Sequence, residues 1–321
     1  MKILLLGASG LLGHNVLKLL VQHHHQVRCL LRRPMQFPFP TPDVEFLLGS
    51  PLSEDNLHKA AHGCEAVINC AGITDMALLH QEDYFPVNRD LPQLLVQLME
   101  HSDLIHTLVQ VSTANTIGFG SPQKPATESA SMQEPFLSSF YALSKRAGEN
   151  LLLDAVKRLP HKRILIINPG FMVGPYDFKP SSGKLLLSAY RLPLMLAPKG
   201  GKSFVPVVDV AAAVVAALSR GQSGSRYLVT GENLSLRQFY RLQAQVCGYR
   251  QCLLSIPNGV ALFVAKFGDL LRALGIPTQL SSRNVRQLLI REFYDDSLAQ
   301  NELALTPSSL SDAIRDFFAE R

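Results

Sequence analysis

Short apolar runs alternate with longer stretches in which apolar residues recur every three or four positions through the first two thirds of the chain. The runs predict buried strands, and the periodic stretches predict amphipathic helices. We expect strands at residues 3–6, 27–31, 44–48, 66–70, 107–112 and 163–168, and helices at about 11–24, 54–61, 87–101 and 137–158. This alternation predicts an α/β fold in which helices cover both faces of a doubly wound parallel sheet.

Beyond Pro169 the alternation breaks up. The interruptions are Pro175, Pro180, Pro193, Pro198 and the pair Gly200-Gly201. We expect Phe204 to Val208 and Arg226 to Val229 to return to the sheet, separated by a helix of about 210–220 that Asp209 caps. The sequence therefore predicts a larger unit at 1–175 and 204–230 and a smaller one at 176–203 and 231–321.

Two long apolar stretches raise the question of a membrane span. Val205 to Leu218 is interrupted by Asp209, and Val260 to Leu274 by three charged residues. Neither reaches the roughly 20 apolar residues that a span needs, so we expect no transmembrane segment. We expect Val260 to Leu274 to be buried against the larger unit, with attachment to a membrane surface through one apolar face as the alternative.

Composition narrows the classes of partner. The net charge of +5 arises from scattered basic residues, so we expect no nucleic-acid-binding face. Five cysteines without a CxxC spacing predict neither a disulfide framework nor a zinc site, and they fit a reducing cytoplasm. His23, His24 and His25 are consecutive and point in different directions on a helix, so we expect no metal site.

The first apolar run, too short for the core of a secretory leader, leads into GASGLLG, with Gly7, Gly10 and Gly13 in the turn. Glycine permits the dihedral angles of a tight turn, the approach of a pyrophosphate and close packing of the helix on the strand. The N-terminus of that helix offers free N–H groups to the anion. We therefore expect the larger unit to be a Rossmann-type dinucleotide-binding domain.

The second predicted strand ends next to Arg32 and Arg33. A NAD site of this type places a carboxylate here for the ribose 2′-hydroxyl, whereas a guanidinium pairs with the 2′-phosphate of NADP. We expect NADP as the cofactor, with NAD possible. The alternative is that both arginines are merely solvated.

Tyr141 and Lys145 lie four residues apart on a predicted helix, which places them on one face. The pKa of a free phenol is about 10. We expect the Lys145 ammonium to lower the pKa of Tyr141, so that the phenol can exchange a proton with a substrate oxygen. Ser112 and Thr113 follow at the end of a predicted strand, and either hydroxyl could orient that oxygen.

With these motifs the sequence resembles the extended short-chain dehydrogenase/reductases, which include the NAD-dependent epimerases and dehydratases. The likeness covers nearly the whole chain: GASGLLG at 7–13, INCAG at 68–72, VNRD at 87–90, VSTANTIG at 111–118, YALSK at 141–145, NPGFMVGP at 168–175, FVPVVDVA at 204–211 and LTPSSLSDAIRDFF at 305–318. The resemblance implies that Tyr141 is the acid–base, that Lys145 contacts Tyr141 and the nicotinamide ribose, and that Thr113 rather than Ser112 orients the substrate.

The resemblance also implies the cofactor contacts. They are Gly7, Ser9, Gly10, Leu11, Leu12 and Gly13 in the turn, Arg32 at the adenosine ribose, Ala71, Gly72 and Lys145, and then Pro169, Gly170, Phe171 and Met172 at the nicotinamide end. Asn88 matches a family asparagine whose role is either to bind a water molecule or structural. The resemblance further implies that the smaller unit binds the substrate and that the protein forms a homodimer through the helices that carry Asn88 and Tyr141.

Two positions depart from the family pattern. Gly49-Ser50-Pro51 stands where the family has Gly-Asp, whose acid reaches the adenine. Ala114 and Asn115 stand where family dehydratases carry an Asp-Glu pair, so the residues that eliminate water are missing.

Three functions remain. The first is an NADP-dependent oxidoreductase, resembling dihydroflavonol reductases and 3β-hydroxysteroid dehydrogenases, that moves a hydride to or from a carbonyl or alcohol carbon of a small apolar substrate. The alternatives are a nucleotide-sugar epimerase with tightly bound NAD, and a non-catalytic dinucleotide sensor. Apolar residues in the smaller unit favour an apolar substrate, although core packing explains them equally well: Phe171, Met172, Leu185 to Leu187, Tyr190, Leu194 and Met195.

Overall fold

A parallel sheet forms the centre of the molecule. The computed structural model describes residues 1–179 and 182–320, so Pro180 lies outside the described residues. Within them, seven strands form the main sheet in the order β10-β6-β5-β4-β1-β2-β3. Their bounds are Lys2–Leu6 (β1), Gln26–Leu31 (β2), Val44–Leu48 (β3), Ala66–Asn69 (β4), Thr107–Val111 (β5), Arg163–Pro169 (β6) and Arg226–Val229 (β10). The predicted doubly wound α/β fold is confirmed.

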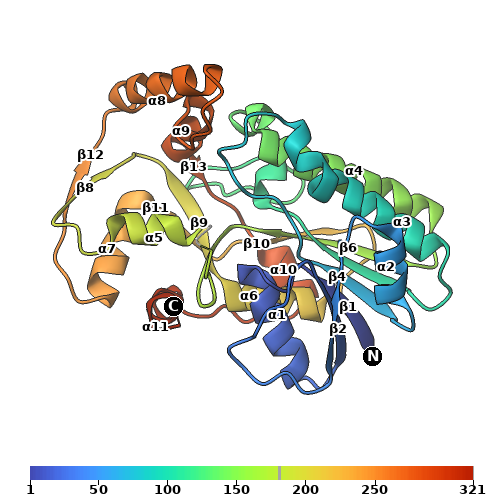
Figure 1. Cartoon of the computed structure of the whole chain (residues 1–321). Helices are drawn as coiled ribbons and strands as arrows, with labels where there is room; N and C mark the ends of the chain where they lie inside the picture. Colours follow the sequence, from blue (N-terminus) through green and yellow to red (C-terminus); the bar gives the residue numbers. More distant parts are fainter. Residues whose placement is uncertain (180–181, 321) are drawn as a thin grey trace.

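Helices cover both faces of this sheet (Figure 1). On one face α1 (Leu11–Gln22), α6 (Val207–Ala216) and α10 (Ser297–Glu302) pack over residues such as Leu5 and Ile167. On the other face α2 (Glu54–Ala61), α3 (Leu91–Glu100) and α4 (Phe140–Arg158) pack over Leu4 and Ile166. Alternate residues of β1 and β6 therefore enter opposite cores, which is why these strands read as unbroken apolar runs.

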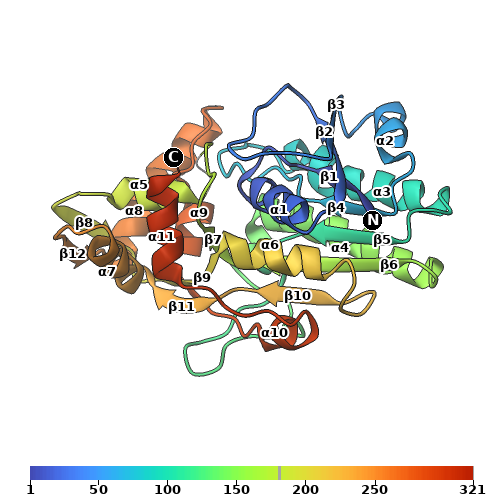
Figure 2. The ribbon, with the colours of Figure 1, turned by 90° about the horizontal axis from the view of Figure 1, so that it is seen from below.

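The rest of the chain forms a smaller part beside the sheet (Figure 2). One small sheet has the order β11-β9-β13, with β7 also paired to β9, and a second joins β12 to β8. The strands are Phe171–Val173 (β7), Leu194–Ala197 (β8), Gly201–Pro206 (β9), Glu232–Ser235 (β11), Cys252–Ser255 (β12) and Arg291–Glu292 (β13). The helices are Gly183–Ala189 (α5), Leu236–Val246 (α7), Asn258–Ala273 (α8), Ser282–Leu289 (α9) and Leu310–Ala319 (α11).

Two expectations around residue 205 are wrong. The segment 204–208 does not rejoin the main sheet, because β9 pairs with β7, β11 and β13 instead. Asp209 does not cap the next helix, because α6 already begins at Val207, after Pro206. The Asp209 carboxylate lies in the first turn and accepts a hydrogen bond of 2.9 Å from the backbone N–H of Ser308.

The helix expected at about 87–101 is divided. Pro86–Asp90 forms a π-helical turn and α3 follows from Leu91. Pro92 has no N–H to offer the carbonyl group of Asn88, so the regular α-helical bond cannot form there. A Cβ at Gly148 would lie 2.3 Å from this Asn88 carbonyl oxygen, which shows how closely α4 packs here.

The α8 helix is not buried against the main sheet, so the preferred expectation for Val260 to Leu274 is wrong. Among its residues only Ala265 and Gly268 are buried. Six large apolar side chains of this stretch are exposed: Val260, Phe263, Val264, Phe267, Leu270 and Leu274. Figure 1 shows α8 at the upper edge of the molecule, with α9 beneath it.

Candidate active site

The glycine turn lies where the order of the main sheet reverses. Strand β1 has β2 on one side and β4 on the other, and the chain leaves β1 and β4 at the same edge. In doubly wound sheets such a switch point is the ligand-binding edge. Gly7 has a φ of +79°, and a Cβ there would lie 2.5 Å from the backbone nitrogen of Ala71. The loops after β1 and β4 are thus in direct contact.

The glycines of the turn have different surroundings. A Cβ at Gly13 would lie 2.1 Å from the carbonyl oxygen of Gly7, so helix–strand packing requires glycine there. A Cβ at Gly10 would meet nothing closer than 3.5 Å. Gly10 is the N-cap of α1 and makes no side-chain cap bond, and it is exposed together with Ser9. The first N–H groups of α1 are therefore open to an anion, while the side chains of Leu11 and Leu12 are buried in the core.

Ala71 and Gly72 bring the loop after β4 close to Lys145. The backbone N–H of Ala71 donates to the Asn69 side chain at 3.0 Å. A Cβ at Gly72 would lie 3.7 Å from Lys145 Nζ. Asn88 holds the next residue of this loop, since its amide exchanges hydrogen bonds with the backbone of Ile73 at 2.9 and 3.0 Å. These contacts support the structural role of Asn88.

Tyr141, Lys145 and Thr113 are brought together, as the sequence predicts. Ser139 caps α4, which places Tyr141 in its first turn and Lys145 one turn later. The side chain of Thr113, which lies just after β5, is close enough to the Tyr141 phenol to lower the pKa of that phenol. The hydroxyl of Ser112, by contrast, is buried and has no hydrogen-bond partner within the described part of the chain. Thr113 is the hydroxyl that faces the tyrosine.

The expected effect of Lys145 on the tyrosine is wrong for the protein without a bound dinucleotide. Burial raises the pKa of Tyr141 to about 12, and the neighbouring Thr113 side chain offsets this only in part. Lys145 Nζ instead donates to the carbonyl oxygen of Val111 at 2.7 Å. Burial lowers the pKa of this Lys145 ammonium to about 8, against a smaller raising effect of Glu149. The ammonium is thus held by β5 and not by the phenol.

Sequence reasoning missed the buried Glu149, which follows Lys145 by four residues, as Lys145 follows Tyr141. Its Oε1 accepts hydrogen bonds of 2.7 Å from both Thr116 Oγ1 and Asn168 Nδ2. Asn168 Nδ2 also donates to the carbonyl oxygen of Thr113 at 3.0 Å. Glu149 therefore fixes the loop that carries Thr113, and the repeat of four along α4 is the signal that could have identified it.

Arg32 and Arg33 are exposed just beyond the end of β2. The pairing of Leu6 with Leu30 places Arg32 at the same edge as the glycine turn. Neither arginine forms a hydrogen bond or ion pair with any residue that the structure describes. Ser50, in place of the family acid, accepts a hydrogen bond of 3.2 Å from the N–H of Leu52, so its side chain supports a turn.

The segment from Pro169 to Met172 crosses from the main sheet to the smaller part. Pro169 ends β6, and Gly170 is pressed against β9, because a Cβ there would lie 2.7 Å from the carbonyl oxygen of Ser203. Phe171 packs into the smaller part, with its ring 5.3 Å from that of Phe204, whereas Met172 packs against the core beneath α1. Their cofactor contacts stay a prediction.

Most of the apolar residues named as a substrate lining serve as core. Leu186 is buried in the cluster around Phe204 and Phe239, and Leu185, Leu187 and Met195 pack against it. The ring of Tyr190 stacks on Phe318 at 4.3 Å. Leu194 is the exception, since it is exposed on β8.

Helices α8 and α9 are fastened next to Tyr141. Arg272 donates hydrogen bonds to the carbonyl oxygens of Ala77 and Leu78, at 3.0 and 2.5 Å. The guanidinium of Arg283 lies 3.5 Å from the ring centre of Phe140, the residue before the tyrosine. The helix pair is thus a direct neighbour of the candidate catalytic residues.

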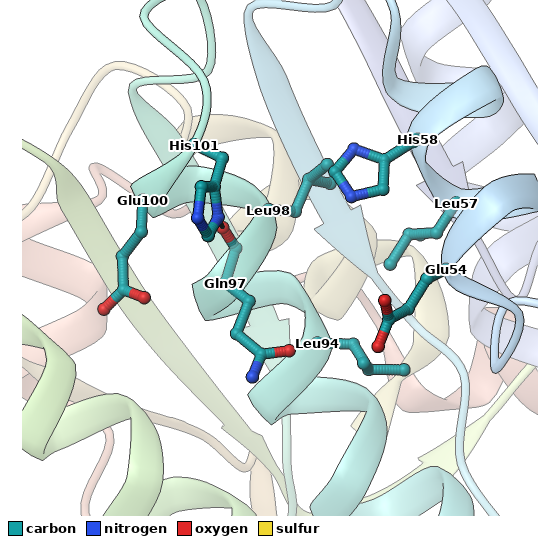
Figure 3. A pocket seen from close by; sticks show the side chains of 8 residues that line it. All are labelled: Glu54, Leu57, His58, Leu94, Gln97, Leu98, Glu100 and His101. Carbon is teal, nitrogen blue, oxygen red and sulfur yellow. Dashed lines mark hydrogen bonds between the residues drawn. The ribbon is translucent and has the colours of Figure 1, made fainter.

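A separate hollow lies away from these residues. It has a volume of about 330 Å³ and opens between α2 and α3, where His58 and Glu54 face Gln97 and His101 (Figure 3). None of the predicted site residues lines it. This hollow is therefore not part of the candidate active site at the switch point.

Comparison with known proteins agrees with this arrangement. The family model described as the NAD dependent epimerase/dehydratase family matches residues 3–230. The chain is 28% identical to sterol demethylase protein B of Methylococcus capsulatus, covering 100% of this chain and 99% of that protein. It is 26% identical to a putative dihydroflavonol 4-reductase of Synechocystis, covering 97% and 91%. It is 28% identical to the ceramide reductase of Caulobacter vibrioides, covering 92% and 86%.

Solved structures share the fold over the whole chain. The crystal structure of gox2253 superposes with a TM-score of 0.83 at 25% identity, covering 99% of this chain and 97% of that one. The UDP-glucuronic acid 4-epimerase of Bacillus cereus, in complex with UDP-glucuronic acid and NAD, superposes with a TM-score of 0.75 at 18% identity, covering 100% and 98%. At that identity the second likeness concerns the fold alone.

Proposed function

Because the chain belongs to the NAD dependent epimerase/dehydratase family and is an NAD(P)-dependent enzyme of the extended short-chain type, we propose that it transfers a hydride between NADP(H) and a carbonyl or alcohol carbon of an apolar substrate. The observation that carries the proposal is that the Thr113 side chain faces the Tyr141 phenol, with Lys145 one helical turn further on and close to Gly72.

The residues of the switch point fit a dinucleotide. The uncapped start of α1 and the open space at Gly10 suit a pyrophosphate. The unpaired guanidinium of Arg32, at the same edge, suits the 2′-phosphate that distinguishes NADP from NAD. When bound, the nicotinamide supplies or accepts the hydride.

The side chains around the nicotinamide carry out the proton transfer and position the substrate. Tyr141 gives a proton to the substrate oxygen in the reducing direction, and its raised pKa keeps the phenol protonated at neutral pH. Thr113 orients that oxygen by a hydrogen bond. Lys145, held by the carbonyl oxygen of Val111 and close to Gly72, is placed to contact the nicotinamide ribose. Ala114 and Asn115 offer no acid or base for the elimination of water.

An apolar substrate agrees with the names of two relatives. Sterol demethylase protein B and ceramide reductase are named for lipids, and both match this chain over nearly their full length. An epimerase with bound NAD is the second candidate, because the fold is shared with the UDP-glucuronic acid 4-epimerase. We also propose a cytoplasmic location, which suits the five free cysteines, and a homodimer through α3 and α4. The described residues contain no helix long and apolar enough to cross a membrane.

The deciding experiment is titration of the purified protein with NADPH and with NADH, followed by assays with apolar ketones and with UDP-sugars. We expect tighter binding of NADPH and its oxidation by ketones. Tyr141→Phe should reduce turnover by about 10²-fold or more while the dinucleotide affinity survives. Tyr249→Phe, in the smaller part, is the matched control. Preference for NADH with conversion of a UDP-sugar would establish the epimerase instead, and binding without any turnover would establish a sensor.

A further inference from the structure

Helix α8 carries two apolar faces, and only one of them is covered. The covered face holds Ala265 and Gly268, and a Cβ at Gly268 would lie 1.7 Å from the carbonyl oxygen of Leu280. This contact leaves no room for the helix to rotate. The opposite face is therefore fixed toward the outside of the molecule.

The outward face is long and continuous. Its large side chains recur at helical spacing: Val260, Phe263, Val264, Phe267, Leu270 and Leu274. Phe263 is 76% exposed, Leu274 68% and Phe267 61%. Single exposed apolar residues are normal on a protein surface, but a row of this length marks a site that another apolar phase or molecule covers.

The charge around α8 indicates what covers it. Residues 258–291, which include α8 and α9, contain five lysines and arginines and a single acid, Asp269, whereas the net charge of the whole chain is only +5. Lys266 on α8 itself is exposed, as are Arg286 and Arg291 nearby in sequence. A second copy of this surface would bring like charges together, while an anionic lipid surface would be attracted.

We propose that α8 is an interfacial helix that docks the protein on an anionic membrane, with its apolar face among the acyl chains and the basic residues at the headgroups. At 16 residues α8 lies in the plane of the interface and does not span it. This proposal stands on the surface alone and does not depend on which reaction the site performs.

Docking through α8 also places the candidate site at the lipid surface. Arg272 ties α8 to the loop at Ala77 and Leu78, and Arg283 of α9 packs on Phe140 beside Tyr141. An apolar substrate dissolved in the bilayer would then reach the tyrosine without crossing bulk water. A membrane-bound enzyme and a lipid-like substrate are thus mutually consistent.

The test is flotation of the full-length protein with phosphatidylcholine vesicles and with vesicles of equal parts phosphatidylcholine and phosphatidylglycerol. We expect binding to the mixed vesicles that weakens as salt is raised. Phe263→Ser with Phe267→Ser should weaken this binding by about tenfold per residue. Lys266→Gln with Arg286→Gln should weaken it by about fivefold per charge. Leu48→Ser with Leu104→Ser, also exposed but away from α8, is the matched control and should bind normally.

Several outcomes would overturn the proposal. The first is failure of the unmodified protein to float with anionic vesicles. The second is a loss of vesicle binding in the control variant that equals the loss in the α8 variants. The third is vesicle binding that is unchanged when the two phenylalanines are replaced. A stable dimer in solution that the phenylalanine substitutions dissociate would show that a second copy covers the face. Unchanged dinucleotide affinity in every variant verifies that the proteins are folded.

Discussion

Lys145 Nζ donates a hydrogen bond of 2.7 Å to the carbonyl oxygen of Val111, the last residue of β5. Strand β5 leads directly to Thr113, and Lys145 lies one turn after Tyr141 on α4. The contact therefore joins the two elements that carry the candidate acid–base and the orienting hydroxyl. It holds the ammonium in place in the protein without dinucleotide, at the cost of burying a charge.

That buried charge has a consequence for stability that depends on pH. The pKa of Lys145 is about 8 in the folded protein, against about 10.4 for an unfolded lysine. Between these values the unfolded state binds more protons, so this group makes folding more favourable as the pH rises. We predict that the unfolding free energy of the unmodified protein, minus that of Lys145→Met, increases by about 1–3 kcal/mol from pH 7.5 to 10.

Urea denaturation of the dinucleotide-free proteins at both pH values measures this difference. Lys157→Met is the control, because the Lys157 side chain lies on the same helix and is 78% exposed. A difference that stays flat or falls for Lys145 would mean that the ammonium is better solvated than its surroundings indicate.

Thr113 and Ser112 allow a paired test of the orienting hydroxyl. The Thr113 side chain faces the Tyr141 phenol, whereas the Ser112 hydroxyl is buried without a partner among the described residues. Removing an unsatisfied hydroxyl costs little, so Ser112→Ala should change both turnover and stability slightly, within about 1 kcal/mol. Thr113→Ala should lower kcat by about 10²-fold, and Thr113→Ser should restore most of it. Steady-state kinetics with NADPH and a ketone decides, and equal losses at both positions would contradict the assignment.

The sequence predicts the parts of this molecule that follow from local patterns. Apolar runs and helical spacing locate β1 to β6, and the same spacing pairs Tyr141 with Lys145 on α4. Where packing over long distances decides, the prediction fails. The apolar run that begins at Phe204 is typical of a strand of the main sheet. It belongs instead to β9, which pairs with segments about ninety residues away in sequence, such as Arg291.

The electrostatic interactions of the candidate site also could not be predicted from the sequence. A spacing of four residues places Lys145 near Tyr141, but it does not reveal that Lys145 Nζ donates a hydrogen bond to the carbonyl oxygen of Val111. The role of Glu149 depends on Thr116 and Asn168, which reach it from other segments. The exposure of α8 is likewise a property of the assembled fold, because its apolar residues look the same in sequence whether they are buried or not.

Arg32 tests the choice of cofactor. A charge-assisted hydrogen bond to a phosphate contributes about 1.5–3 kcal/mol. We therefore predict that Arg32→Gln weakens NADPH binding by about 10- to 100-fold and changes NADH binding by less than about threefold. Arg33→Gln should have a smaller effect, since the strand register brings Arg32 nearer to the glycine turn. Fluorescence titration measures all four affinities, and equal losses for NADPH and NADH would remove Arg32 from the 2′-phosphate.

Gly10 and Gly13 lie in the same turn, but we expect substitution of Gly10 to affect dinucleotide binding and substitution of Gly13 to affect stability. An added Cβ at Gly13 would lie 2.1 Å from the carbonyl oxygen of Gly7, so Gly13→Ala must push α1 away from β1 and should cost about 2 kcal/mol or more of unfolding free energy.

At Gly10 the nearest atom is 3.5 Å away and φ is −95°, which alanine adopts readily. Gly10→Ala should therefore change stability by less than about 1 kcal/mol. Yet its methyl group projects into the space where a pyrophosphate would approach, so NADPH affinity should fall by about tenfold or more. Urea denaturation and NADPH titration of both variants check the pair. If Gly10→Ala binds NADPH normally, the anion does not rest on this turn.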